Sequence, residues 1–128
     1  MKTIILPQFI DEAKLISTQD QYTIPFPIKR VFIISDIKRG TIRGRHAHRS
    51  CKQAIFCIQG VATIVLDTGT KKERRRFKKS NKGIFIDTMT WFEMRAFAPR
   101  TILLVFASER FRENDYIRSY KLFLNSRT

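Results

Sequence analysis

The sequence predicts an all-β fold, a sandwich or jelly roll, and three observations support this. Short apolar runs alternate with turn residues along most of the chain. The segments between these runs are too short for the helical crossovers that a mixed α/β sheet requires. The chain has 128 residues, of which 43% are hydrophobic, which is enough for one domain with its own core. We therefore expect a single domain over residues 1–128.

Five segments have the β-branched and aromatic composition of strands, and turn residues separate them. In chain order the predicted strands are Arg30–Ile37, Ala54–Ile58, Val61–Leu66, Gly83–Ile86 and Thr101–Ala107. The first ends before Gly40 and the second ends at Gly60. We expect these strands to form the two layers of the fold.

Helix is predicted at two places only. Asp11–Ile16 is a short candidate near the start of the chain. Near the end, Asn114–Leu124 places Tyr116, Tyr120 and Phe123 at helical spacing on one face. The predicted fold therefore includes a short C-terminal helical segment.

We expect neither a membrane-spanning helix nor a secretion signal in this chain. The longest apolar run, Ile102–Ala107, falls far short of the roughly 20 residues that cross a bilayer. Pro7 interrupts the first apolar residues, so we expect no signal peptide. Cys51 and Cys57 share one predicted extended segment, which separates them by about 20 Å. A disulfide cannot span that distance, and we predict free thiols in a cytoplasmic protein.

The chain is strongly basic, with 25 Lys and Arg against 11 Asp and Glu, a net charge of +14. Lys71–Lys79 alone holds seven basic residues, with Phe77 as its only aromatic. Such a segment suits nucleic acid or anionic lipid. It equally suits a solvated hairpin whose charges prevent edge-to-edge pairing, and single-stranded nucleic acid usually needs more aromatics. We favour the hairpin, expect no membrane or nucleic-acid partner, and keep nucleic-acid binding as an alternative.

Both histidines lie in one motif, Arg43–His48. Side chains two residues apart in a strand share a face, so His46 and His48 are expected to point together. Histidine exchanges protons near neutral pH, which favours acid/base chemistry. A metal site would need a third ligand, and the residues from Arg49 to Lys52 offer mainly positive charge. We predict an anion-binding cleft without metal, with metal binding and a purely structural histidine pair as alternatives.

Motifs from Arg30 to Phe123 occur in the order found in one known family. The matching residues are Arg30-Val31-Phe32, Arg43-Gly44 with His46-Ala47-His48 and Gln53, Gly60, Gly83-Ile84-Phe85-Ile86, Trp91, Glu93, Ala107-Ser108, Glu113, Asp115-Tyr116-Ile117-Arg118, Tyr120 and Phe123. With them the chain resembles the sugar-nucleotide 3,4-ketoisomerases, RmlC-like cupins that act on dTDP-4-keto-6-deoxyglucose without metal.

The resemblance implies a cupin jelly roll that forms a homodimer, with an N-terminal strand at about residues 1–10 exchanged between the chains. It also implies an isomerase that moves the keto group from C4 to C3 of the hexose through an enediolate. No cofactor is required, and the product serves deoxyamino-sugar and surface-polysaccharide synthesis. The substrate partner is a dTDP-linked 4-keto-6-deoxyhexose.

The resemblance also implies roles for individual side chains. His48 is expected to carry the proton, with His46 orienting the sugar or assisting. Substrate contacts are expected from Arg43, Gln53 and Trp91, because a guanidinium binds phosphate or enediolate oxygens in a fork. The residues expected to stabilise the C-terminal segment are Asp115, Tyr116 and Arg118.

The chain departs from the family pattern at Phe32 and Ile34, where tyrosines are common, and at Lys52, where a histidine is common. The strand that begins at Arg30 therefore presents no hydroxyl toward the histidines. This leaves a second hypothesis, a cupin that binds a sugar nucleotide without isomerising it.

Overall fold

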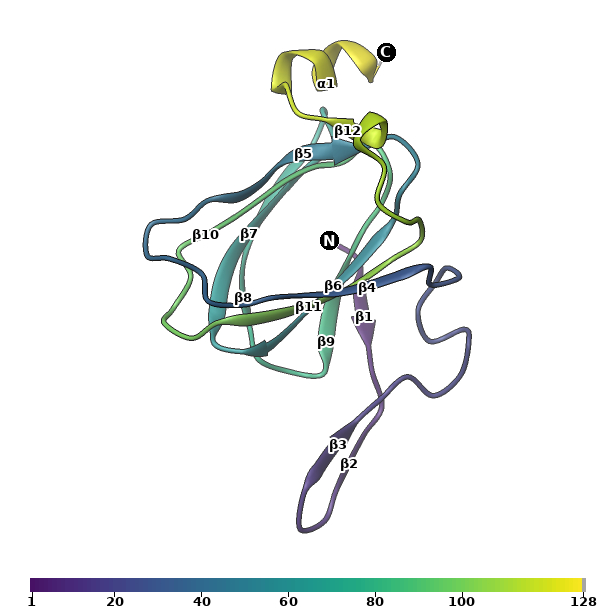
Figure 1. Ribbon diagram of the computed structural model, residues 1–128, viewed down its shortest axis with the longest axis vertical. Helices are drawn as coiled ribbons and strands as arrows, with labels where there is room; N and C mark the ends of the chain where they lie inside the picture. The colour runs from purple at the N-terminus through teal and green to yellow at the C-terminus, as the bar shows by residue number, and fades with distance from the viewer. Residues whose placement is uncertain (128) are drawn as a thin grey trace.

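The computed structural model describes residues 1–127 as two five-stranded antiparallel sheets packed face to face, with a separate two-stranded hairpin (Figure 1). One sheet has the order β1-β9-β6-β11-β4 and the other β12-β5-β10-β7-β8. The strands are β1 (Thr3–Ile5), β2 (Gln8–Ile10), β3 (Lys14–Ile16), β4 (Arg30–Ile34), β5 (Arg43–His48), β6 (Gln53–Gln59), β7 (Val61–Asp67), β8 (Lys72–Lys78), β9 (Lys82–Ile86), β10 (Trp91–Arg95), β11 (Ile102–Ala107) and β12 (Tyr116–Ile117). A 3₁₀ turn at Glu113–Asp115 and helix α1 (Tyr120–Ser126) complete the chain.

The main core lies between the two sheets, where alternate residues of each strand point inward. In β11, Leu103 and Val105 belong to this core. Their neighbours Leu104 and Phe106 face the opposite side of the sheet, where a second apolar cluster forms around Phe56. The sheet is thus apolar on both faces, which explains why β6 is a continuous apolar run instead of an alternating one.

The all-β jelly-roll prediction is confirmed, and the five predicted strands correspond to β4, β6, β7, β9 and β11. The basic segment forms β8, the outermost strand of its sheet. Phe77 points into the core from this strand, while Lys72, Arg74 and Lys78 are exposed. None of the helices in residues 1–127 is long and apolar enough to cross a membrane.

The predicted helix at Asp11–Ile16 is wrong, because this segment forms the turn and second strand of the β2–β3 hairpin. The backbone N–H of Asp11 donates to the Ala13 carbonyl, and the Asp11 carboxylate accepts from the Ala13 N–H. An aspartate that accepts from the backbone two residues ahead favours a turn over a helix. This hairpin projects from the body of the molecule (Figure 1).

The predicted helix at Asn114–Leu124 is only partly correct. Tyr116 and Ile117 form β12, which pairs with β5, so the helix starts at Tyr120. The Ser119 hydroxyl caps it by accepting a hydrogen bond from the Leu122 N–H.

A bulge in β5 shapes the strand that carries the histidines. Gly44 and Arg45 have φ angles of 83° and 59°, and the register of β5 against β10 shifts between Phe92 and Glu93. A Cβ at Gly44 would lie 2.7 Å from the Phe92 carbonyl oxygen, so glycine is required here for two reasons. Beyond the bulge, His48 pairs with Tyr116 of β12, which places the C-terminal segment beside the histidines.

Candidate active site

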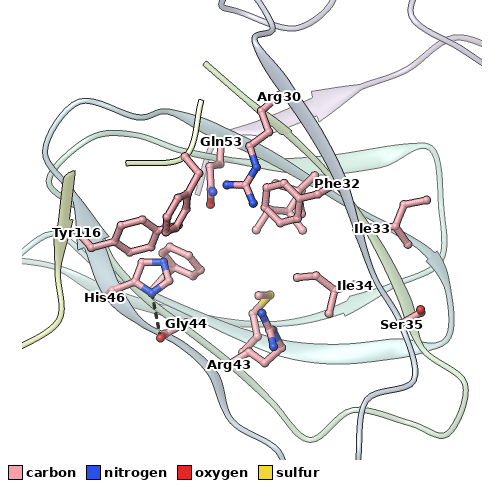
Figure 2. A pocket seen from close by; sticks show the side chains of 15 residues that line it. Arg30, Phe32, Ile33, Ile34, Ser35, Arg43, Gly44, His46, Gln53 and Tyr116 are labelled. Atoms are coloured by element: carbon pink, nitrogen blue, oxygen red, sulfur yellow. Dashed lines mark hydrogen bonds between the residues drawn. The ribbon is translucent and has the colours of Figure 1, made fainter. Parts of the chain in front are cut away.

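A cavity of about 580 Å³ is lined by strands of both sheets and by the C-terminal segment (Figure 2). Its lining includes Arg30, Phe32 and Ile34 of β4, Arg43 and His46 of β5, Gln53 of β6, Phe92 and Met94 of β10, and Phe111 and Tyr116. Three predicted site residues, His46, Arg43 and Gln53, therefore meet in one cavity. Phe32 and Ile34 also line it, so the β4 wall carries no hydroxyl at these two positions.

His48 lies one layer deeper than His46. The residue is only 4% exposed, and it is not among the residues that line the cavity. The His46 and His48 rings meet edge to face, with centroids 4.9 Å apart. The Tyr116 ring, on the cavity wall, lies 4.4 Å from the His48 ring. The histidine pair therefore spans the wall, with His46 at its surface and His48 behind it.

Asp115 holds His48 in place. One carboxylate oxygen lies 2.9 Å from Nδ1 of His48, and the other accepts the Ser50 N–H at 2.7 Å. Burial alone would raise the pKa of Asp115, but the hydrogen bonds from Ser50 and His48 outweigh it and lower this pKa. An ionised Asp115 keeps the proton of His48 on Nδ1. The Nε2 atom, which hydrogen-bonds to none of the described residues, is left with its lone pair free.

The pairing of Asp115 with His48 was not among the predictions from the sequence. Asp115 was expected only to stabilise the C-terminal segment, but it contacts a histidine 67 positions earlier in the chain. Tyr116 was given the same stabilising role and instead lines the cavity. One feature of the sequence could have indicated the pairing. Asp115 directly precedes Tyr116 and Ile117, the two residues that form a strand with β5.

Both histidines are held neutral by their surroundings. Burial is the largest influence on His46 and, with the neighbouring His48 and two arginines, lowers its pKa from 6.5 to about 4. The Nδ1 atom of His46 lies 3.0 Å from the Gly44 carbonyl oxygen (Figure 2). Burial also lowers the pKa of His48, although Asp115 opposes this effect by stabilising the protonated ring. His48 is therefore the better placed of the two to hold a transferred proton.

The low pKa of His46 predicts a loss of stability in acid. Between pH 6.5 and about 4 this ring stays neutral in the folded chain but takes up a proton when the chain unfolds. The free energy of unfolding that depends on a neutral His46 is therefore fully present above pH 6.5 and is lost as the pH falls toward 4. This loss amounts to at most about 3 kcal/mol. We expect urea unfolding at pH 7.5 and pH 5 to show a smaller difference for His46→Gln than for the unaltered chain. Equal differences for the two proteins would contradict the shifted pKa.

The structure does not bring Trp91 to the cavity. Its indole is buried on the other face of the β10 sheet, where it packs against Tyr120 and Phe123 of α1. The indole N–H donates to the Glu93 carboxylate. In this position Trp91 packs the C-terminal helix against the sheet. The sequence alone did not distinguish this packing role from a contact with the substrate.

His48, Cys51 and Asp115 place possible metal-ligand atoms within 4.8 Å of one another. The Asp115 oxygens, however, already accept hydrogen bonds from His48, Ser50 and the Cys51 N–H. Burial raises the pKa of the Cys51 thiol, which disfavours the thiolate that metals bind. The donor set therefore suits a hydrogen-bonded carboxylate–histidine pair better than a metal centre.

Comparison with known proteins supplies close relatives. The family model described as "FdtA: WxcM-like, C-terminal" matches residues 1–128. A TDP-4-oxo-6-deoxy-α-D-glucose 3,4-oxoisomerase from Aneurinibacillus thermoaerophilus is 33% identical over 95% of this chain and 88% of its own length.

Two solved structures are also similar. A 3,4-ketoisomerase from Helicobacter canadensis has a TM-score of 0.92 and 36% identity, covering 98% of this chain and 95% of its own. A histidine-to-asparagine mutant of the 3,4-ketoisomerase QdtA from Thermoanaerobacterium thermosaccharolyticum, in complex with TDP-4-keto-6-deoxyglucose, has a TM-score of 0.92 and 29% identity, covering 98% of this chain and 91% of its own. The resemblance inferred from the motifs is confirmed. This chain belongs to the FdtA family of WxcM-like C-terminal domains, whose relatives include sugar 3,4-ketoisomerases.

Proposed function

We propose that this protein isomerises a TDP-linked 4-keto-6-deoxyhexose by moving the carbonyl from C4 to C3. The observation that carries the proposal is the buried Asp115–His48 pair, which leaves a basic nitrogen behind the wall of a 580 Å³ cavity. The names of the relatives point to the same reaction and the same class of substrate.

The chemistry needs one proton carrier and one cationic group. The ketone at C4 acidifies the C3–H bond, and Nε2 of His48 takes this proton to leave an enediolate. The protonated His48 then delivers a proton to C4, while O3 loses its hydroxyl proton and O4 gains one, so the carbonyl ends at C3 with no change in overall composition. Arg43 on the cavity wall stabilises either the enediolate or the diphosphate, and Gln53 hydrogen-bonds the sugar.

His48 is assigned as the carrier although His46 is nearer the cavity. A ring with a pKa of about 4 is a weak base at neutral pH, and within residues 1–127 no carboxylate hydrogen-bonds to His46, whose Nδ1 contacts only the Gly44 carbonyl. Asp115 stabilises the protonated form of His48. Because Nε2 of His48 is buried, substrate contact requires the rings of His46 or Tyr116 beside it to shift.

The test is to incubate the purified protein with dTDP-4-keto-6-deoxyglucose in D₂O and follow the reaction by proton NMR. Loss of the C3 proton signal with formation of a 3-keto species is the expected result. Binding of dTDP without exchange would instead support the non-catalytic cupin. Phe32 and Ile34 favour that second candidate, because they leave the β4 wall without a hydroxyl to hold the sugar or relay protons.

We also propose that the protein is a cytoplasmic homodimer. Its cysteines are free thiols, as predicted, which suits a reducing compartment. β1 pairs with β9 of its own chain, so the element available for exchange is the projecting β2–β3 hairpin. Phe9, Ile10 and Leu15 on this hairpin are each about 60% exposed or more. Apolar surface of this kind marks an interface.

Light scattering is expected to give twice the 15.1 kDa mass of one chain. Phe9→Asp with Leu15→Asp should shift the protein toward the monomer, because burying two carboxylates in the interface is costly. A monomeric unaltered protein at micromolar concentration would refute this proposal and leave the isomerase proposal standing.

A further inference from the structure

Strand β8 has one edge that no other strand of residues 1–127 pairs with. It is the last strand in the order β12-β5-β10-β7-β8, and its only partner is β7. With seven residues it is the longest edge strand of the two main sheets, since β1 has three, β4 five and β12 two. Proteins protect edges with short strands, proline, bulges or charge. β8 is long, contains no proline and pairs in regular register from Lys72 to Lys78, so charge is its protection.

The backbone groups of β8 alternate in direction along the strand. At the two ends of its ladder with β7, the Lys79 N–H donates to the Gly60 carbonyl and the Thr68 N–H donates to the Lys71 carbonyl. Hydrogen-bonded pairs alternate with non-hydrogen-bonded pairs in an antiparallel ladder, so the odd-numbered residues of β8 bond to β7. The even-numbered residues direct their N–H and C=O groups to the open edge. These residues are Lys72, Arg74, Arg76 and Lys78.

The same four residues carry a row of cations on the outer face of the sheet. Phe77 points into the core, so the even-numbered side chains point outward, about 6.6 Å apart along the strand. All four residues are exposed, and no carboxylate in the described part of the chain forms an ion pair with them. The Arg76 guanidinium donates to the Thr63 hydroxyl and the Ala96 carbonyl, which holds its charge over this face.

We propose that the open edge of β8 binds an extended segment of another protein that carries acidic side chains at alternate positions. An added antiparallel strand supplies partners for the free N–H and C=O groups. Its side chains opposite Arg74, Arg76 and Lys78 lie within about 5.5 Å of them on the outer face, where opposite charges stabilise the pair. A second copy of β8 would place cations against cations, which is destabilising.

The backbone groups distinguish this partner from other polyanions. Nucleic acid or anionic lipid would neutralise the cations but would leave the row of N–H and C=O groups at the edge without a strand partner. The outer row of β8 also presents no aromatic side chain on which bases could stack, because Phe77 faces the core. β7 and β10 separate β8 from β5, so a bound strand leaves the cavity beside the histidines open. The proposal is therefore independent of the proposed function.

The probe is a capped nine-residue peptide of alternating glutamate and threonine, and amide hydrogen exchange by NMR is the readout. We expect the peptide to slow exchange of the Arg74 and Arg76 N–H groups. The Arg75 N–H, which already bonds to β7, should exchange slowly with or without peptide. A peptide N-methylated at its glutamates keeps its charge but cannot donate to the edge. It should bind at least about tenfold more weakly.

Charge reversal on β8 supplies the second arm. Arg74→Glu with Lys78→Glu removes two cations whose side chains hydrogen-bond to nothing else within residues 1–127, so the fold and any isomerase activity should be retained. This variant should bind the glutamate peptide at least about tenfold more weakly and should bind a lysine–threonine peptide instead. Lys38→Glu with Arg39→Glu makes the same change in net charge on an exposed loop and should leave peptide binding unchanged.

Three results would overturn the proposal. The first is no binding of the glutamate peptide at millimolar concentration. The second is equal binding of the N-methylated peptide, or equal weakening by the loop variant, because either would reduce the interaction to net charge. The third is tighter binding of a DNA duplex than of the peptide, which would assign the surface to nucleic acid.

Discussion

Replacing His48 with asparagine is expected to lower kcat for 3,4-isomerisation by at least about 100-fold, the usual contribution of a positioned acid/base group. The substitution removes Nε2, the nitrogen that we assign to proton transfer. The asparagine amide can still donate a hydrogen bond to Asp115, so the buried carboxylate keeps a partner. We expect the variant to fold and to bind dTDP nearly as the unaltered protein does, because the expected substrate contacts Arg43 and Gln53 are unchanged.

His46→Asn is the informative comparison, since the two histidines differ in pKa and in exposure. We expect a smaller loss of kcat from this variant, because His46 is a weak base and its ring hydrogen-bonds to a backbone carbonyl instead of a carboxylate. Proton exchange at C3 in D₂O measures both variants directly. If the His48 variant retained more than about a tenth of the activity, or if the His46 variant lost more, proton transfer would belong to His46 at the cavity surface.

The parts of this site that are local in the sequence could be predicted, and the parts made by long-range pairing could not. His46 and His48 stand two residues apart in a strand, so their shared wall follows from strand geometry. The partner of His48 depends on β12 pairing with β5, a contact between segments about 70 residues apart. Sequence patterns carry no information about which distant segments meet, and Asp115 was therefore given only a structural role.

The predicted substrate contact of Trp91 is absent for a related reason. Trp91 lies one residue before Phe92, which lines the cavity, so the two side chains point to opposite faces of β10. The sequence did not predict β10, and without the strand there was no basis for choosing a face. The prediction of a helix at Asp11–Ile16 was wrong because six residues are too few to establish a helical period. The hydrogen bond from the Ala13 N–H to the Asp11 carboxylate favours a turn instead.

Replacing Asp115 with asparagine is expected to lower kcat by about 100-fold or more. The positions of the other active-site side chains are expected to change very little. The side-chain oxygen is expected to keep the Ser50 N–H, the shorter of the two backbone hydrogen bonds at 2.7 Å against 3.3 Å for the Cys51 N–H, and this orients the amide nitrogen toward Nδ1 of His48. Two N–H groups cannot face each other, so the His48 proton must move to Nε2. The nitrogen that should accept the substrate proton is then already protonated, and the carboxylate that stabilised the charged ring is gone.

A purely structural role of Asp115 and a role in positioning His48 are distinguished by the NMR spectra of the histidine side chains. ¹⁵N NMR of the histidine side chains should show the proton of His48 on Nδ1 in the unaltered protein and on Nε2 in Asp115→Asn. Glu113→Gln, in the same turn but ion-paired to Arg118 at the surface, serves as the control and should leave the His48 signals unchanged. If Asp115→Asn kept the Nδ1 proton and full activity, the carboxylate would merely tie β12 to β5. If the variant lost activity together with its thermal stability, denaturation would explain the loss, and the tautomer would have to be compared in the folded fraction. A folded, dTDP-binding and inactive protein with its proton on Nε2 is the outcome that only a positioned base predicts.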